Sequence, residues 1–534
     1  MPAASAAART RSGIPVAATP GSVTSSARRT PRRASSHPAS ATAPGPYLTG
    51  VASSVKTVSR SMVQKRASCG AVAPLREGRR LVKHGSDSVK HGRWRWLVAV
   101  AGLGLALPGT ASAEVPIFPE MAVQGNGRAH FAWNWSDGAA EGVQERWRTA
   151  AGSFSETQWA TPARQGAELA GIATDAAGDA AIVWQETTPG SGFDRIRLRW
   201  READGTVRPV QTLSTLGADT FGPDVAVDPA GNAYVTWVEV ASGGVTGVVR
   251  VRRRAADGTL GPTETVSPAS GVQPRATRIV ADKAGNAIVA WEGLSSGVIS
   301  VRTRRRDVST GQWSASQRLS YLDGNAYGLD LAVDEDGNAT YAWLFDPGTS
   351  SGIHVRRRKV DGTLSAIQAI SGQVADSEAG RLFESPRVAV TPTGAATVSW
   401  TRLDSGGNRA VEARRRRPDG YLSAIATMTD PGVNAFAPRI ATDAGGNATV
   451  VWAAYNGEGG YGAYARRRSI SGTLGPVHSL APLPVDVLGT TVGVDGTGNA
   501  LVAWTGFVEG SGRRIQVRRV APNGTEGPTE TIAP

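Results

Sequence analysis

The chain has 534 residues, of which 40% are hydrophobic and 19% are charged, a composition that allows a large folded core. Its formal net charge of +13 suggests a nucleic-acid partner, but the charge is unevenly distributed. Residues 1–113 contain 17 Lys/Arg and 2 Asp/Glu, whereas residues 114–534 contain 41 Lys/Arg and 43 Asp/Glu, a net charge of −2. The basic character belongs to the leader, so we exclude nucleic acid as the partner of the remaining chain.

Residues 1–88 are rich in Ser, Ala, Pro, Thr and Arg and show no apolar periodicity, which predicts a disordered leader. Because a signal peptide follows, we also consider a misassigned start codon, with translation beginning at Met62 or Val89. The single cysteine, Cys69, lies in this leader. The rest of the chain is therefore expected to contain neither a disulfide nor a thiolate site.

Residues 89–113 have the features of a secretory signal peptide. Basic residues between Lys90 and Arg95 precede the 11-residue apolar run Leu97–Leu107, which is too short to span a bilayer. Ala111-Ser112-Ala113 matches a signal-peptidase cleavage site. We predict a secreted, extracellular protein cleaved after Ala113, with no membrane span; a short buried helix is the alternative interpretation of this segment.

An internal repeat fills residues 114–534. The stretch VAVDPAGNAYVTW (Val225–Trp237) returns as IVADKAGNAIVAW (Ile279–Trp291) and as LAVDEDGNATYAW (Leu331–Trp343). The tryptophan that ends each stretch occurs eight times, at intervals of 51–57 residues, which indicates a repeat architecture. These tryptophans are Trp133, Trp184, Trp237, Trp291, Trp343, Trp400, Trp452 and Trp504.

Each unit predicts four strands. The first strand enters a D-x-x-G-N turn, in which Asp228 caps the turn and Gly231 supplies a positive φ. The second strand ends at the tryptophan, and the arginine-rich third strand turns at D-G-T into the fourth. About 52 residues per unit predict an all-β, eight-bladed β-propeller with four antiparallel strands per blade.

Two other repeat architectures fit the unit length less well. The units of an open β-solenoid are shorter, and tandem immunoglobulin-like domains need nearly twice the length per unit. Both the first and the last unit contain all four strands. We therefore expect the ring to close by packing alone, without a strand exchanged between the ends, and the protein to be a monomer.

The stretch Val225–Val235 also resembles the first hairpin of the NHL and SBBP types of bacterial propeller repeat, whose pattern is similar to V-A-V-D-x-x-G-N-x-Y-V. The other units match this pattern to different degrees, and the rest of each unit does not match. The second strand here ends in Trp, where NHL repeats tend to have Asp. The resemblance implies a propeller and an extracellular setting, but it implies no substrate.

Two residue types recur at fixed places in every unit. The tryptophans are expected to form the core between blades. Arginine occupies one position of the third strand in all eight units and recurs at the next two positions. A ring of guanidinium groups could bind a polyanion such as teichoic acid or a sulfated glycan, or the arginines could cover the blades with their heads paired or stacked. Because Trp147 and Trp200 replace arginine at the second position, we favour packing.

Loop length predicts where a ligand would bind. The loops before the first strand and after the second strand are long and varied, and both lie on one face of a propeller. Near the mouth of the central channel on this face, we identify seven candidate ligand-binding residues. They are Glu168, Phe221, Arg275, Tyr327, Phe383, Glu384 and Phe436. Further aromatic residues in the second-to-third loops are Trp135, Phe193, Phe345, Tyr455, Tyr461 and Phe507. They could bind sugars or a protein, or they could plug the channel and pack the loops.

The sequence assigns no catalytic residue, metal site or cofactor. His130, His354 and His478 are scattered over three units, and the turn aspartates lack the carboxylate density of a calcium site. We predict a secreted binding or interaction module for a cell-wall glycan or a protein. A secreted carbohydrate-active hydrolase or lyase, using acids at the channel mouth such as Glu168 and Glu384, is the alternative. The exact ligand is not specified by the sequence.

Overall fold

The computed structural model describes residues 117–136, 141–162, 166–187, 192–241, 246–268, 272–372, 385–403, 407–455, 460–481, 485–508 and 512–533. The predicted leader and signal peptide lie outside these residues. Within them, regular structure consists of 32 β-strands and no helix. They form eight sheets of four antiparallel strands, and each sheet takes four consecutive strands. We call these sheets blades 1 to 8, in chain order.

The strands have the following bounds. Blades 1 to 4 contain β1 (Ile117–Val123), β2 (Ala129–Ser136), β3 (Glu141–Arg148), β4 (Gln158–Trp159), β5 (Ala167–Thr174), β6 (Ala180–Thr187), β7 (Asp194–Arg201), β8 (Gln211–Thr212), β9 (Ala218–Val227), β10 (Ala233–Ala241), β11 (Gly247–Arg254), β12 (Leu260–Thr265), β13 (Gln273–Ala281), β14 (Ala287–Ser295), β15 (Val298–Arg306) and β16 (Gln317–Arg318). Blades 5 to 8 contain β17 (Asn325–Val333), β18 (Ala339–Asp346), β19 (Gly352–Arg358), β20 (Gln368–Ala369), β21 (Arg387–Val390), β22 (Ala396–Leu403), β23 (Arg409–Arg416), β24 (Ala426–Thr427), β25 (Ala435–Thr442), β26 (Ala448–Tyr455), β27 (Tyr461–Arg468), β28 (Leu474–Ser479), β29 (Val485–Val494), β30 (Ala500–Val508), β31 (Gly512–Val520) and β32 (Glu526–Ala533).

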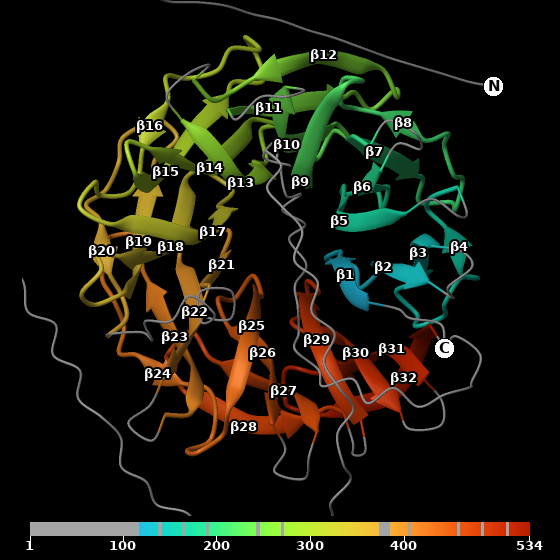
Figure 1. Cartoon of the computed structure of the whole chain (residues 1–534). Coiled ribbons are helices and arrows are strands. Elements are labelled where there is room, and N and C mark those ends of the chain that lie inside the picture. Colours follow the sequence, from blue (N-terminus) through green and yellow to red (C-terminus); the bar gives the residue numbers. More distant parts are fainter. Residues whose placement is uncertain are drawn as a thin grey trace, which may run out of the picture. The chain divides into compact units, whose positions relative to one another are not determined.

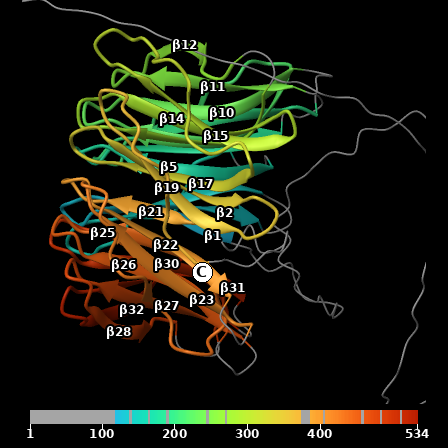
Figure 2. The same ribbon diagram turned by 90° about the vertical axis from the view of Figure 1, so that its left-hand side faces the viewer.

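The blades follow one another around a central axis, with the first strand of each blade innermost (Figure 1). These inner strands contact each other in sequence order, and β29 contacts β1. The eight-bladed β-propeller is confirmed, and the described part of the ring closes by packing without an exchanged strand. Seen edge-on, the strands run between the two faces of the ring (Figure 2). We call the face with the second-to-third loops the variable face, and the face with the D-x-x-G-N turns the turn face.

The D-x-x-G-N turn folds as its residue types dictate. Asp228 Oδ1 accepts hydrogen bonds from the backbone amides of Ala230 and Asn232, at 3.0 and 2.9 Å. Gly231 has a φ of 80°, which is costly for residues with a Cβ. Asn232 Nδ2 donates to Asp228 Oδ2 at 2.7 Å. The turn therefore satisfies its own polar groups although Asp228 is buried.

The eight repeated tryptophans are buried, each at most 1% exposed. Each one packs on the preceding blade. Trp237 lies with Val183 and Leu198 of blade 2, and Trp133 lies with Leu501 and Val517 of blade 8. The junction between the last and first blades therefore has the same core as an internal junction.

Arginines at the first position of the third strand join neighbouring blades. In blade 1, Arg146 Nη1 donates to the carbonyl oxygen of Ile532 in blade 8, at 2.9 Å. The same bond, at 3.0–3.5 Å, joins Arg199 to Trp159, Arg252 to Leu213, Arg304 to Val266, Arg356 to Leu319, Arg414 to Ile370, Arg466 to Met428 and Arg518 to Leu480. These guanidinium groups bind backbone rather than facing a polyanion, in agreement with the packing interpretation.

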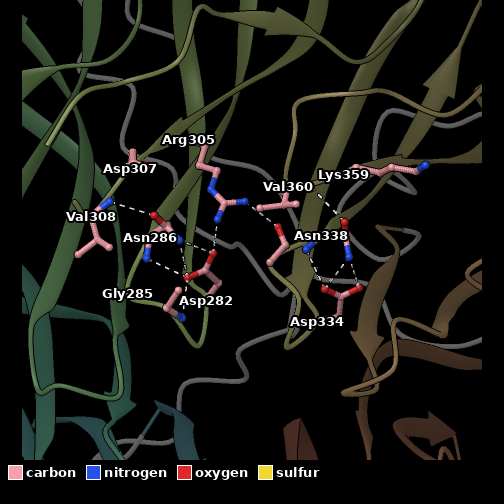
Figure 3. A network of polar contacts seen from close by, with 12 residues as sticks. Asp282, Gly285, Asn286, Arg305, Asp307, Val308, Asp334, Asn338, Lys359 and Val360 are labelled. Carbon is pink, nitrogen blue, oxygen red and sulfur yellow. Dashed lines mark hydrogen bonds and ion pairs between the residues drawn. The ribbon is translucent and has the colours of Figure 1, made fainter. Parts of the chain in front are cut away.

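Arginines at the second position tie a turn to the next blade, as Figure 3 shows for Arg305. Arg305 Nη2 donates to Asp282 Oδ2 of its own blade at 2.6 Å, and Nη1 donates to the carbonyl oxygen of Gly337 in the next blade at 3.0 Å. Arg357 and Arg467 repeat this pair of contacts. The turn aspartates therefore act as partners of arginine.

Arginines at the third position form a clamp with a Gln or Glu on the fourth strand of the preceding blade. Six junctions have it: Arg148–Glu530, Arg201–Gln158, Arg254–Gln211, Arg306–Glu264, Arg358–Gln317 and Arg416–Gln368. The two junctions of blade 7 lack it. Ala426 replaces the acceptor opposite Arg468, and Val520 replaces the arginine opposite His478. Cavities of about 380 and 430 Å³ lie at these two junctions.

Candidate functional site

The predicted candidates lie on the innermost strands toward the variable face. Glu168, Phe221, Tyr327 and Phe436 each pair with the residue that follows the repeated tryptophan, and Arg275 lies at a β-bulge of β13. Glu168 and Arg275 are exposed, whereas the three aromatic residues are half-buried. Phe383 and Glu384 lie outside the described residues. The candidates thus occupy equivalent positions in different blades, and the fold does not gather them into one cluster.

One candidate belongs to a group of aromatic side chains in blade 7. The ring of Phe436 meets that of Tyr461 edge-on, with centroids 5.2 Å apart, and Tyr461 meets Tyr455 at 5.9 Å. Tyr455 and Tyr461 are 44% and 36% exposed. We call Phe436, Tyr455 and Tyr461 the aromatic patch. It lies on the variable face because Tyr455 ends β26 and Tyr461 begins β27.

The other loop aromatics have different surroundings. Phe345 is buried and stacks on His354, with ring centroids 4.7 Å apart, and the exposed Tyr321 contacts both rings. Trp135 packs edge-on against Trp159 at 5.1 Å. Phe507 is 44% exposed in blade 8. In blades 1 and 5 these aromatics therefore pack the loops, which was the alternative considered for them.

A second set of residues lies closer to the middle of the inner strands and was not among the predicted candidates. Four residues before the turn aspartate, each inner strand carries a residue that pairs with the one preceding the repeated tryptophan. Around the ring this position holds Glu120, Gly171, Asp224, Arg278, Asp330, Arg387, Arg439 and Thr491. We call the six charged members the axial ring. The repeat length could have located this position, but only ring closure brings its occupants together.

The axial charges act on each other across several blades. Burial raises the pKa of Glu120, and the nearby guanidinium groups of Arg439 and Arg387 oppose that rise. Burial also raises the pKa of Asp224, against the lowering effect of Arg278. Despite this proximity, no ion pair within 4.0 Å joins two axial side chains in the described part of the chain.

Two axial carboxylates have structural partners. Asp224 Oδ2 accepts a hydrogen bond from the backbone amide of Ile279 in the next blade at 2.8 Å. Asp330 Oδ2 accepts one from the amide of Val388 at 2.9 Å. Arg278 lies in the blade between them, and although burial disfavours its charge, the carboxylates of Asp224 and Asp330 raise its pKa. Blades 3 to 5 therefore form a compensated acid–base–acid sequence.

Blades 6 and 7 place two arginines side by side instead. Repulsion by Arg439, together with burial, lowers the pKa of Arg387 to about 9. The buried Nε of Arg387 has no hydrogen-bond partner among the described residues. Arg439 donates through Nη1 to the carbonyl oxygen of Pro438, next to it in the chain, at 3.4 Å. We call Arg387 and Arg439 the basic pair. It is the part of the axial ring with the least compensated charge.

The described residues contain no group of three or more His, Cys, Asp or Glu side chains placed to hold a metal ion. Nor does the described part of the chain include a helix of the length and apolarity needed to cross a membrane.

Comparisons with known proteins concern the repeat and the fold. The family model "Beta-propeller repeat" (SBBP) matches residues 210–236, from β8 at the end of blade 2 into β10 of blade 3. No curated protein matches the chain. Among solved structures, the BP39L lectin from Burkholderia pseudomallei is 13% identical with a TM-score of 0.44, over 68% of this chain and 98% of that chain. The Dos1 propeller is 8% identical with a TM-score of 0.45, over 76% of this chain and 92% of that chain. Likenesses of this size have no bearing on function.

Proposed function

This chain is a β-propeller repeat protein, and from that premise we propose that its propeller is a secreted ligand-binding or interaction module for a cell-wall glycan or a protein. The observation that carries the proposal is the aromatic patch, where two tyrosines are exposed beside the innermost strand of blade 7. Exposed aromatic rings bury large apolar area on binding while their hydroxyl groups remain able to form hydrogen bonds. A glycan is the ligand we favour, since sugar rings have one apolar face.

The axial ring supports a second candidate function, a carbohydrate-active hydrolase or lyase. Glu120 is a carboxyl group with a raised pKa, as a general acid requires. Glycoside hydrolysis generally needs a second carboxylate that is free to act as base or nucleophile. Asp224 and Asp330 are instead engaged by backbone amides of neighbouring blades. This difference is why we favour binding over catalysis.

One experiment tests both candidates. The purified protein is incubated with a panel of polysaccharides and with isolated cell-wall fractions, and binding and new reducing ends are followed in the same samples. We expect binding without new reducing ends. Replacing Tyr461 or Tyr455 by Ala should weaken that binding by about 5- to 13-fold, which corresponds to about 1–1.5 kcal/mol for an aromatic contact.

A matched control comes from the opposite face. Tyr421 is 62% exposed and lies beside Arg417 at the third-to-fourth turn of blade 6, so Tyr421→Ala should leave binding unchanged. New reducing ends that disappear in Glu120→Gln would replace the binding proposal by the hydrolase. Equal loss in Tyr421→Ala and Tyr461→Ala would remove the aromatic patch from the proposal. For secretion, N-terminal sequencing of protein from the culture medium should give Glu114 as the first residue.

A further inference from the structure

We propose that the basic pair binds a carboxylate group, so that the ligand of the propeller is a glycan containing uronic acid residues. This inference rests on the proposed function and names the class of glycan. It places the acidic group of one sugar at Arg387 and Arg439 and a neighbouring part of the chain on the aromatic patch.

The first argument is position. Arg387 begins β21 and Arg439 lies in β25, and these two inner strands contact each other in adjacent blades. Both arginines occupy the axial position, as their pairing with Ser399 and Val451 shows. Two guanidinium groups on neighbouring inner strands can approach one carboxylate from two sides, and the planar fork of arginine suits a carboxylate.

The second argument is the absence of an internal partner. The arginines of the outer strands bind backbone carbonyls, glutamine or carboxylates, mostly those of a neighbouring blade. The Nε of Arg387 lacks a hydrogen-bond partner among the described residues, as do the Nε atoms of the outer-strand Arg199 and Arg357. Those two arginines are held through their Nη atoms, whereas Arg387 is repelled by Arg439. Buried polar groups in folded proteins are nearly always paired, and a bound anion would give the Nε of Arg387 an acceptor and offset the repulsion between the two arginines.

The third argument is the charge of the surroundings. Besides Arg439 and Arg278, the carboxylates of Asp330 and Glu120 act on Arg387. The axial ring is formally balanced, with three carboxylates and three guanidinium groups, so a single carboxylate at the basic pair meets less repulsion from Asp330 and Glu120 than a ligand that carries two negative charges. This balance favours a uronate over a phosphate group.

The fourth argument links the basic pair to the aromatic patch. Phe436 lies on the same strand as Arg439, three residues earlier, which is about 10 Å along an extended strand. A β-bulge separates the two positions, so their side chains need not alternate regularly. Aromatic rings beside a cationic site suit the combination of an apolar sugar face and a carboxylate on the same polymer. An acidic peptide shares the carboxylate and is treated as an outcome of the test.

The experiment measures binding of oligomers of α-1,4-linked galacturonic acid to the full chain by calorimetry. The matched ligand is the same oligomer with its carboxyl groups reduced to hydroxymethyl groups. We expect the acidic oligomer to bind at least tenfold more tightly. Arg387→Met and Arg439→Met should each weaken its binding by about 10- to 100-fold, as expected for a charge-assisted hydrogen bond. Arg387→Lys should recover part of the affinity, because it restores the charge but not the fork.

The control variant is Arg417→Met, which removes an exposed arginine from the third-to-fourth turn of blade 6 and should not change binding. A measurement on the unaltered protein guards against misfolded variants: millimolar galacturonate, but not glucose, should raise the midpoint of thermal unfolding. Equal affinity for the acidic and the reduced oligomer overturns the carboxylate proposal but leaves the proposed function standing. Tighter binding of poly-glutamate or inorganic sulfate than of the uronate oligomer also overturns it. No binding of any glycan or cell-wall fraction overturns both.

Discussion

Arginines of the outer strands and arginines of the axial ring are the same residue type in two opposite situations. Arg201 is fully buried in blade 2, where it binds Glu145 of blade 1 at 2.7 Å, Gln158 at 2.6 Å and the ring of Trp147 at 4.4 Å. Arg387 lacks comparable partners. The difference teaches that arginines repeated in most blades join neighbouring blades, whereas the axial position, whose residue changes from blade to blade, is where we propose that a ligand binds.

The largest effect on stability is expected from removing a buried arginine of the outer strands. Arg201→Met removes the partner of the buried Glu145 carboxylate and leaves its charge uncompensated. We expect the free energy of unfolding to fall by about 3–5 kcal/mol, without a change in glycan affinity. Urea denaturation followed by tryptophan fluorescence measures the first quantity, and calorimetry measures the second.

Two variants serve as references for Arg201→Met. Arg208→Met removes an exposed arginine of the same blade, whose ion pair with Glu202 lies at the surface, and should change stability by less than about 0.5 kcal/mol. Arg387→Met should reduce binding while it changes stability by no more than about 1 kcal/mol, because a poorly compensated buried charge is lost. A large destabilisation by Arg387→Met would show that Arg387 stabilises the fold, and it would contradict the distinction between axial and outer-strand arginines.

An intermediate effect on stability is expected when the pH is lowered. Burial, assisted by the charges of Arg128 and Arg201, lowers the pKa of His130 to about 3, compared with about 6.5 in an unfolded chain. Below about pH 6.5 the unfolded state takes up a proton that the folded state rejects, so stability is lost as the pH falls towards 3. From pH 8 to pH 5 His130 alone should cost about 2 kcal/mol.

The matched variant for the acid effect is His130→Tyr, because Tyr234 occupies the corresponding position of blade 3. The tyrosine cannot be protonated in this range, so the loss of stability between pH 8 and pH 5 should be smaller by about 2 kcal/mol. Urea unfolding at the two pH values gives the difference. If His130→Tyr loses as much stability between pH 8 and pH 5 as the unaltered protein, then other groups dominate acid unfolding.

The smallest effect on stability is expected from adding an arginine–glutamine clamp at a junction that lacks one. The double change Val520→Arg with His478→Gln would give the junction of blades 7 and 8 the arginine–glutamine pair found at other junctions. We expect a gain of about 1 kcal/mol in unfolding free energy, the usual net value of a hydrogen bond. Val520→Arg alone should gain less, since Arg would then face His478. A double variant that is no more stable than either single one would show that the clamps contribute little.

The fold could be predicted almost entirely from the sequence, and the site only in part. Trp237 has a counterpart in all eight units, at intervals of 51–57 residues, and Asp228 has one in most of them; their chemistry specifies a buried ring and a tight turn. Phe436 was identified because it lies near a variable loop. Arg387 and Arg439 were not identified, because each is one polar residue in a strand and they are 52 residues apart. Their adjacency arises only from packing two blades side by side, which no local pattern encodes.

The junction between blades 8 and 1 has a consequence for how the gene could be rearranged. It contains the buried Trp133 and the bond from Arg146 to Ile532, as internal junctions contain their own counterparts. Since every blade is built from one contiguous segment, the polypeptide link between two blades contributes connectivity but no strand of its own. A circularly permuted gene, opened between any two blades and joined by a flexible linker from blade 8 to blade 1, should encode the same propeller.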